Sequence, residues 1–166
     1  MAVSDELETY LEDHHGGSAA GVSLAKRLCE EHKGTAFGTV MAGILAEIQE
    51  DQEVLLDLLD RLGMDHSPVK QAVGWVGEKV SRLKLNGPAS GSSELSRMMQ
   101  LEGLSLGIEG KRLLWVALRD AHVDEPPIRG LDLDGLIARA ETQRRTIEPH
   151  RAEAAANAFR ADQPPA

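Results

Sequence analysis

Apolar residues recur every three to four positions along most of the chain, which is the period of an α-helix. This pattern predicts four long helices, at about residues 4–32, 36–62, 93–121 and 132–159. Ser4 and Thr35 are suited to N-caps and Gly63 to a C-terminal cap, so local chemistry supports these limits. A shorter helix is expected at about 67–84, because Ser67-Pro68 is typical of a helix start.

The order of these elements indicates how they pack. Two long helices, a connection that carries the shorter helix, and two more long helices are typical of an antiparallel four-helix bundle with one long crossover. The segments on either side of the Gly/Ser-rich loop at 86–93 are too short to fold alone. We therefore expect a single all-α domain over residues 1–160, followed by a disordered tail at 161–166. Pro149 lies inside the last helix and predicts a kink or a break there.

Charged residues interrupt the apolar faces of the last two long helices. Glu102 and Glu109 lie seven residues apart near the centre of the main apolar stripe of the helix at 93–121. Arg144 and Arg151 have the same spacing on the helix at 132–159. Antiparallel packing would pair Glu102 with Arg151 and Glu109 with Arg144, and we expect these pairs to form a buried polar network. The stripe itself consists of Leu95, Met98, Met99, Leu106, Leu113, Val116 and Ala117.

Three further polar residues lie on or beside the apolar faces of the first two helices: His14, Glu47 and Asp51. Buried carboxylates are rare unless they are paired, hydrogen-bonded or bound to a metal. Together with Glu102 and Glu109, these residues are the candidate ligands for a metal, and such an oxygen-rich set favours iron or manganese over zinc. The other interpretation is that His14 is a core histidine that donates a hydrogen bond to a neighbouring carboxylate.

This organisation resembles the ferritin-like superfamily over about residues 4–159, and it is most similar to small bacterial ferritin-like proteins of unassigned function. In the metal-binding members, two helices each supply one Glu and two others each supply Glu-x-x-His. Glu102 matches a single-Glu position, and His14 stands where the first helix would supply its Glu.

The chain departs from the ferritin pattern at the histidine positions. Glu47-Ile-Gln-Glu50 has a glutamate there, whereas Glu141-Thr-Gln-Arg144 and Glu148-Pro-His-Arg151 have arginines. Arginine stays protonated and has no lone pair for iron. The resemblance therefore implies a non-catalytic bundle without cofactor, in which a Glu/Arg/His network replaces the metal centre. A carboxylate-rich, di-iron-like protein that binds iron or manganese is the alternative.

A second apolar stripe follows the helix at 93–121 through Leu101, Leu104, Ile108 and Trp115. We expect this side to lie away from the bundle interior, covered either by the helix at 67–84 or by a second subunit. The family resemblance favours a homodimer. The same face, or the bundle interior, could instead bind a small molecule or a protein partner, which the sequence does not identify.

Composition and charge narrow the remaining function classes. The chain has 166 residues with 18 Lys and Arg against 27 Asp and Glu, a net charge of −9, which argues against binding nucleic acid or an anionic membrane. No apolar run approaches the length of about 20 residues that a membrane span needs, and the acidic start is unlike a signal peptide, so we expect a cytoplasmic protein. The sequence contains no Walker loop, dinucleotide fingerprint or readable catalytic set, and no catalytic residue is predicted.

Overall fold

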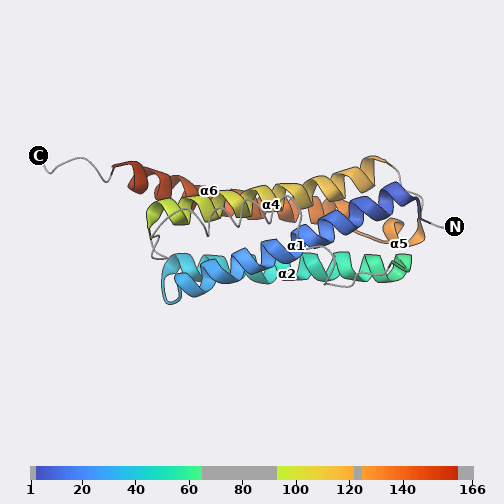
Figure 1. Ribbon diagram of the computed structural model, residues 1–166, viewed down its shortest axis with the longest axis horizontal. Helices are drawn as coiled ribbons and strands as arrows, with labels where there is room; N and C mark the ends of the chain where they lie inside the picture. Colours follow the sequence, from blue (N-terminus) through green and yellow to red (C-terminus); the bar gives the residue numbers. More distant parts are fainter. Residues whose placement is uncertain (1–2, 65–92, 122–124, 161–166) are drawn as a thin grey trace, which may run out of the picture.

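The computed structural model describes residues 3–64, 93–121 and 125–160, and these residues are all-helical, without a strand (Figure 1). The four long helices have the limits that the apolar periodicity predicts, to within one or two residues. The helix expected at 67–84 and the tail at 161–166 lie outside the described residues. The helices are α1 (Asp5–Glu31), α2 (Ala36–Leu62), α4 (Glu94–Asp120), α5 (Pro126–Arg129) and α6 (Leu133–Arg160).

Side chains at the predicted caps set the helix ends. The Ser4 hydroxyl accepts a hydrogen bond from the backbone N–H of Leu7, and the Thr35 hydroxyl accepts one from Gly38. Gly63 ends α2 with φ 74°, a left-handed conformation that glycine adopts without strain. Gly38 is also required, because a Cβ there would lie 2.1 Å from the carbonyl oxygen of His32.

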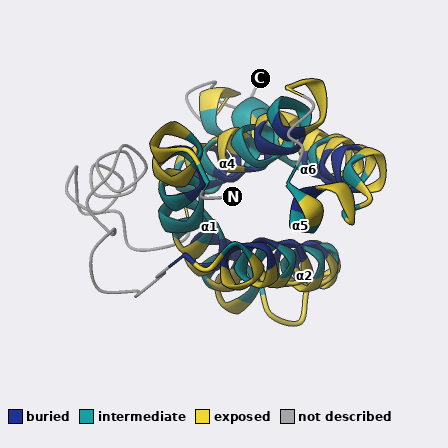
Figure 2. Cartoon of the chain, turned by 90° about the vertical axis from the view of Figure 1, so that its right-hand side faces the viewer, coloured by how far each residue is buried: buried dark blue, intermediate teal, exposed yellow. Residues whose placement is uncertain are grey.

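Seen along the long axis of the molecule, α1, α2, α4 and α6 surround a common interior and turn their buried residues towards it (Figure 2). The largest contact is between α4 and α6. Residue numbers rise along α4 while those of the bonded partners fall along α6, so these two helices run in opposite directions. The ion pairs that show this are Arg97–Glu153 at 3.2 Å, Glu109–Arg144 at 2.6 Å and Arg119–Asp134 at 3.0 Å.

The apolar core consists of two clusters that follow one another along the helices. On α2, Ile48 belongs to the first cluster and Leu55 to the second. On α4 the change falls between Ile108 and Leu114. Between these pairs, the side chains of Asp51 on α2 and Lys111 on α4 are 1% and 16% exposed, so a polar layer interrupts the core.

The face of α4 that enters the core is the opposite of the one expected. Leu101, Leu104, Ile108 and Trp115 are at most 2% exposed and form part of the two clusters, so neither a second subunit nor another helix is needed to cover them. Four residues of the expected stripe lie outside, since Leu95, Met99, Leu106 and Leu113 are 41–49% exposed, whereas Met98 is buried and Val116 and Ala117 are half-buried. This orientation buries the large Trp115 side chain and leaves the glutamates of the other stripe in contact with water, which avoids the cost of burying them.

α6 is continuous from Leu133 to Arg160 with Pro149 inside it, so of the predicted kink or break, the break is wrong. Pro149 lies on the exposed side of the helix, where water can bond to the carbonyl group that loses its N–H partner. The turn-rich connection before α6 contains the short helix α5, which begins at a proline. None of the described helices is both long enough and apolar enough to cross a lipid bilayer.

The inner face of α4 can be tested by truncating one side chain. Leu101→Ala should lower the free energy of unfolding by about 2–5 kcal/mol, because Leu101 is fully buried and its truncation leaves a cavity. Phe159→Ala is the control, since Phe159 is 73% exposed, and it should change stability by about 0.5 kcal/mol or less. Urea unfolding followed by circular dichroism measures both, and equal losses would contradict the assignment of this face.

Candidate functional site

The polar layer in the core is built around Asp51 of α2, whose side chain is 1% exposed. Its carboxylate forms ion pairs with Lys111 of α4 and with Arg139 of α6. The amide of Gln143, also on α6, donates to the same carboxylate at 3.2 Å. Three helices therefore meet at one buried acidic group.

Lys111 lies in the middle of this layer. Its ammonium donates to Asp51 and, at 2.7 Å, to the side-chain oxygen of Gln143. Its side chain is only 16% exposed, so the methylene stem is packed against the core. Burial lowers the pKa of Lys111, and the carboxylate of Asp51 opposes this effect by favouring the charged form.

The charges in the layer balance one another. Arg139 also pairs with Glu50 at 3.1 Å, at the outer edge of the layer. Two carboxylates, Asp51 and Glu50, thus face two cations, Lys111 and Arg139. We name these four residues together with Gln143 the charged layer.

The predicted Glu/Arg pairs are present, but they lie on the surface of the α4–α6 pair rather than in the core. Glu109 and Arg144 are 2.6 Å apart, and Glu102 and Arg151 are 3.5 Å apart. The side chain of Glu102 is 47% exposed and that of Arg144 is 42% exposed. The expected burial of these pairs is wrong, because α4 is rotated relative to the orientation expected from its sequence. The expected pairing is confirmed, because it depends on the spacing of seven residues between the two glutamates and between the two arginines.

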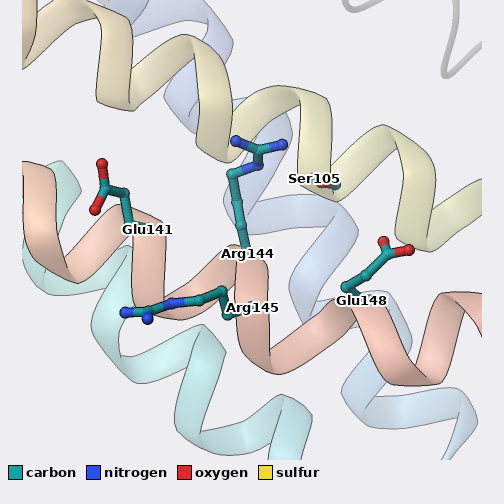
Figure 3. Close-up of a pocket in the computed structure, with 5 residues that line it drawn as sticks. All are labelled: Ser105, Glu141, Arg144, Arg145 and Glu148. Carbon is teal, nitrogen blue, oxygen red and sulfur yellow. The ribbon is translucent and has the colours of Figure 1, made fainter.

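A shallow pocket of about 390 Å³ lies beside these surface pairs, between α4 and α6 (Figure 3). Ser105 lines it from α4, and Glu141, Arg144, Arg145 and Glu148 line it from α6. Nearby, two hydrogen bonds from Arg112 are the main cause of the lowered pKa of Glu109, and Arg144 adds to the effect. The lining of the pocket contains two acidic and two basic side chains, so neither charge is in excess.

His14 lies apart from both charge systems. Its ring packs edge-on against Tyr10, with 4.6 Å between the ring centres. Within the described part of the chain it makes no hydrogen bond to a carboxylate, contrary to the core interpretation of this residue. Burial lowers the pKa of His14, and the neighbouring Asp13 partly offsets this.

The structure does not bring the candidate metal ligands together. Asp51 is in the core, Glu102 and Glu109 are on the outer face of α4, and His14 packs on Tyr10. Glu47 is half-buried on α2, near enough to Lys111 to favour its protonated form. In residues 3–64, 93–121 and 125–160, no three His, Cys, Asp or Glu side chains are close enough to hold a metal ion. The charged layer does not fit a metal either, since Asp51 already lies between two cations.

Sequence reasoning found Asp51 but missed Lys111, Arg139 and Gln143. The position of Lys111 could have been found from the spacing of residues on α4. Lys111 lies three residues after Ile108 and four before Trp115, and hence on the same face of the helix. The other stripe of α4 was expected to face inwards, and Lys111 is not among the predicted site residues. No protein-family model, curated protein or solved structure matches the chain. Its function is therefore inferred from the charged layer and the surface of the bundle.

Two neighbouring carboxylates on α2 allow a matched test of the layer, since both pair with Arg139. Asp51→Asn should cost about 3–5 kcal/mol of stability, because it leaves Lys111 and Arg139 without their buried counter-ion. Glu50→Gln should cost less than about 1 kcal/mol, since the Glu50 side chain is 63% exposed. Chemical denaturation measures the free energy of unfolding of both variants. A loss of stability for Asp51→Asn as small as that for Glu50→Gln would contradict the burial of Asp51.

The half-buried His14 predicts a pH dependence of stability. Because the pKa of His14 is lower in the folded chain, the unfolded chain takes up a proton more readily as the pH falls below about 6.5. The contribution of His14 to stability is therefore complete at neutral pH and is lost on acidification. In His14→Gln the decrease in melting temperature between about pH 7 and pH 5 should be smaller than in the wild type. A decrease of equal size would contradict the lowered pKa.

Proposed function

We propose that this chain is an antiparallel four-helix bundle of ferritin-like type, with residues 65–92 as its long crossover connection. In this proposal the bundle is a non-catalytic, metal-free scaffold, and the charged layer stands in place of a metal centre. The polar residues of the bundle interior are therefore not the Glu/Arg pairs expected from the sequence but the residues of the charged layer: Asp51, Lys111, Arg139, Gln143 and, at the edge, Glu50.

One observation carries the proposal: the ammonium of Lys111 lies between Asp51 and Gln143, inside the bundle. In metal-binding ferritin-like proteins, a metal cation links carboxylates from several helices at the bundle centre. Here the positive charge that links the helices is a covalent part of α4. It neutralises Asp51 without any bound ion.

The surroundings of Asp51 also disfavour metal binding. A divalent cation at Asp51 would be repelled by Lys111 and Arg139, and an arginine cannot be deprotonated to relieve this repulsion. The other acidic candidates, Glu102 and Glu109, are occupied by Arg151 and Arg144 on the surface. The iron- or manganese-binding alternative has no comparable support.

The charged layer is suited to fixing the relative positions of the helices. A buried ion pair is not in general more stable than an apolar contact, because its desolvation cost is large. However, Asp51 reaches Lys111 and Arg139 only in one axial register of α2, α4 and α6. A shifted register would leave buried charges unpaired, so the layer penalises alternative packings.

Metal content tests the proposal directly. Protein purified without chelator, from a culture supplemented with iron and manganese, should contain far less than one metal per chain by elemental analysis. Added Fe²⁺ or Mn²⁺ should leave the melting temperature unchanged, because no folded-state site captures the ion. One or two metals per chain, lost in Asp51→Ala but retained in Glu50→Gln, would overturn the proposal and make the core a metal site.

A further inference from the structure

At one end of the bundle, the buried ring of Phe37 on α2 contacts side chains from the three other long helices. The α1–α2 turn, the start of α4 and the C-terminal part of α6 lie together at this end (Figure 1). The ring of His32, the C-cap of α1, packs edge-on against Phe37 with 4.8 Å between the ring centres. The ring of His150 on α6 lies 4.9 Å from that of Phe37, and the guanidinium of Arg97 on α4 lies 4.3 Å above its centre. We name these four residues the end cluster.

Arg97 places a fixed positive charge in the end cluster. Its guanidinium lies over the electron-rich face of Phe37, which is an attractive arrangement. It also pairs with Glu94 of α4 at 3.5 Å and with Glu153 of α6 at 3.2 Å. The side chain of Arg97 is only 14% exposed, so these contacts hold it in one position. A second cation that forms in the end cluster therefore lies close to a charge that is already held there.

His32 is coupled to the start of α2 through the backbone. Its carbonyl oxygen accepts a hydrogen bond from the N–H of Thr35 at 3.2 Å and another from the Thr35 hydroxyl at 2.7 Å. The same hydroxyl caps α2 by accepting a hydrogen bond from Gly38, which itself packs closely on the His32 carbonyl. The turn at residues 32–38 is therefore one connected unit, and a displacement of His32 also displaces Phe37.

The surroundings of His32 disfavour its protonated form. Burial is the largest cause of the lowered pKa of His32, and the charge of Arg97 lowers it further, while Glu31 and Glu94 offset part of the effect. α2 brings no charged residue to this end, since its first one is Glu47. The charged and titratable groups that the described part of the chain places here are Arg27, Glu31 and Lys33 beside His32 in sequence, Glu94 and Arg97 of α4, and His150 and Glu153 of α6.

From the shared ring contacts, the fixed charge of Arg97 and the connected turn, we propose that this end of the bundle is a pH-sensitive latch. When His32 takes up a proton from solvent, the turn at 32–38 moves away from Arg97 and His150, and the first apolar cluster becomes accessible at this end. The charged layer separates this cluster from the second one, which stays closed. The latch does not depend on whether the core binds a metal.

His14 provides a matched control for the protonation of a half-buried histidine. Its ring also packs edge-on against an aromatic ring, but that ring is Tyr10, four residues earlier on the same helix. The pKa of His14 is likewise lowered by burial. Protonation of His14 does not act on the contact between Phe37 and the other helices, so it should leave the latch unchanged.

Hydrogen exchange of the full chain, followed by mass spectrometry at about pH 7 and about pH 5, tests the latch, since these values bracket the usual pKa of histidine. Protection factors remove the intrinsic pH dependence of exchange. On acidification, the protection of residues 25–44 should fall by about threefold or more beyond that of residues 51–59, because the open end takes up the proton more readily. His32→Gln should abolish this difference between the two regions, whereas His14→Gln should retain it.

Two results would overturn the proposal: an equal fall in both regions of the wild type, or a difference that persists in His32→Gln. If His32→Gln already lowers the protection of residues 25–44 at neutral pH, titration of the histidine rings by nuclear magnetic resonance replaces that variant. The pKa of His32 should then be higher in Arg97→Gln than in the wild type, because the fixed charge is gone. Equal values in the two proteins would also overturn the latch.

Discussion

Burial of the Asp51 carboxylate constrains the rest of the bundle. A buried charge is tolerated only when its partners are in place, and here the partners come from two other helices. The rotation of α4 that brings Lys111 to Asp51 also brings Ile108 and Trp115 into the core, because all three lie on one face of the helix. The same rotation turns Leu106 and the surface glutamates outwards.

The structure contains two sets of charges with different physical roles. In the charged layer, Asp51 is shielded from water, so its interactions are strong and its desolvation is costly. On the outer face of α4, the pair Glu102–Arg151 remains in contact with solvent, where screening makes each ion pair a weak contributor to stability. In the proposed scaffold, the inner set therefore selects one packing of the helices, whereas the outer pairs add little to stability.

These two roles bear on the proposed scaffold. A covalent ammonium at the centre of the bundle supplies the cation that the buried carboxylate requires, and this supports a scaffold in preference to a metal-dependent enzyme. Leu95, Met99, Leu106 and Leu113 remain exposed once the core is complete, since α4 has more apolar surface than a single face can bury. The described residues bury only one of the two apolar faces of α4.

The sequence by itself determined the helices and several of their contacts. The caps at Ser4, Thr35 and Gly63 act locally, so they could be identified without the fold, and the spacing of seven residues was sufficient to predict Glu102 opposite Arg151. Only the tertiary structure decided which side of α4 faces inwards, because both sides have helical apolar periodicity. The orientation of α4 depends on burying the large apolar side chain of Trp115 and on bringing the ammonium of Lys111 to the carboxylate of Asp51. Both requirements arise only when α2, α4 and α6 pack together. The same dependence on neighbours explains why the charged layer could not be assembled from the sequence, although Asp51 could be singled out.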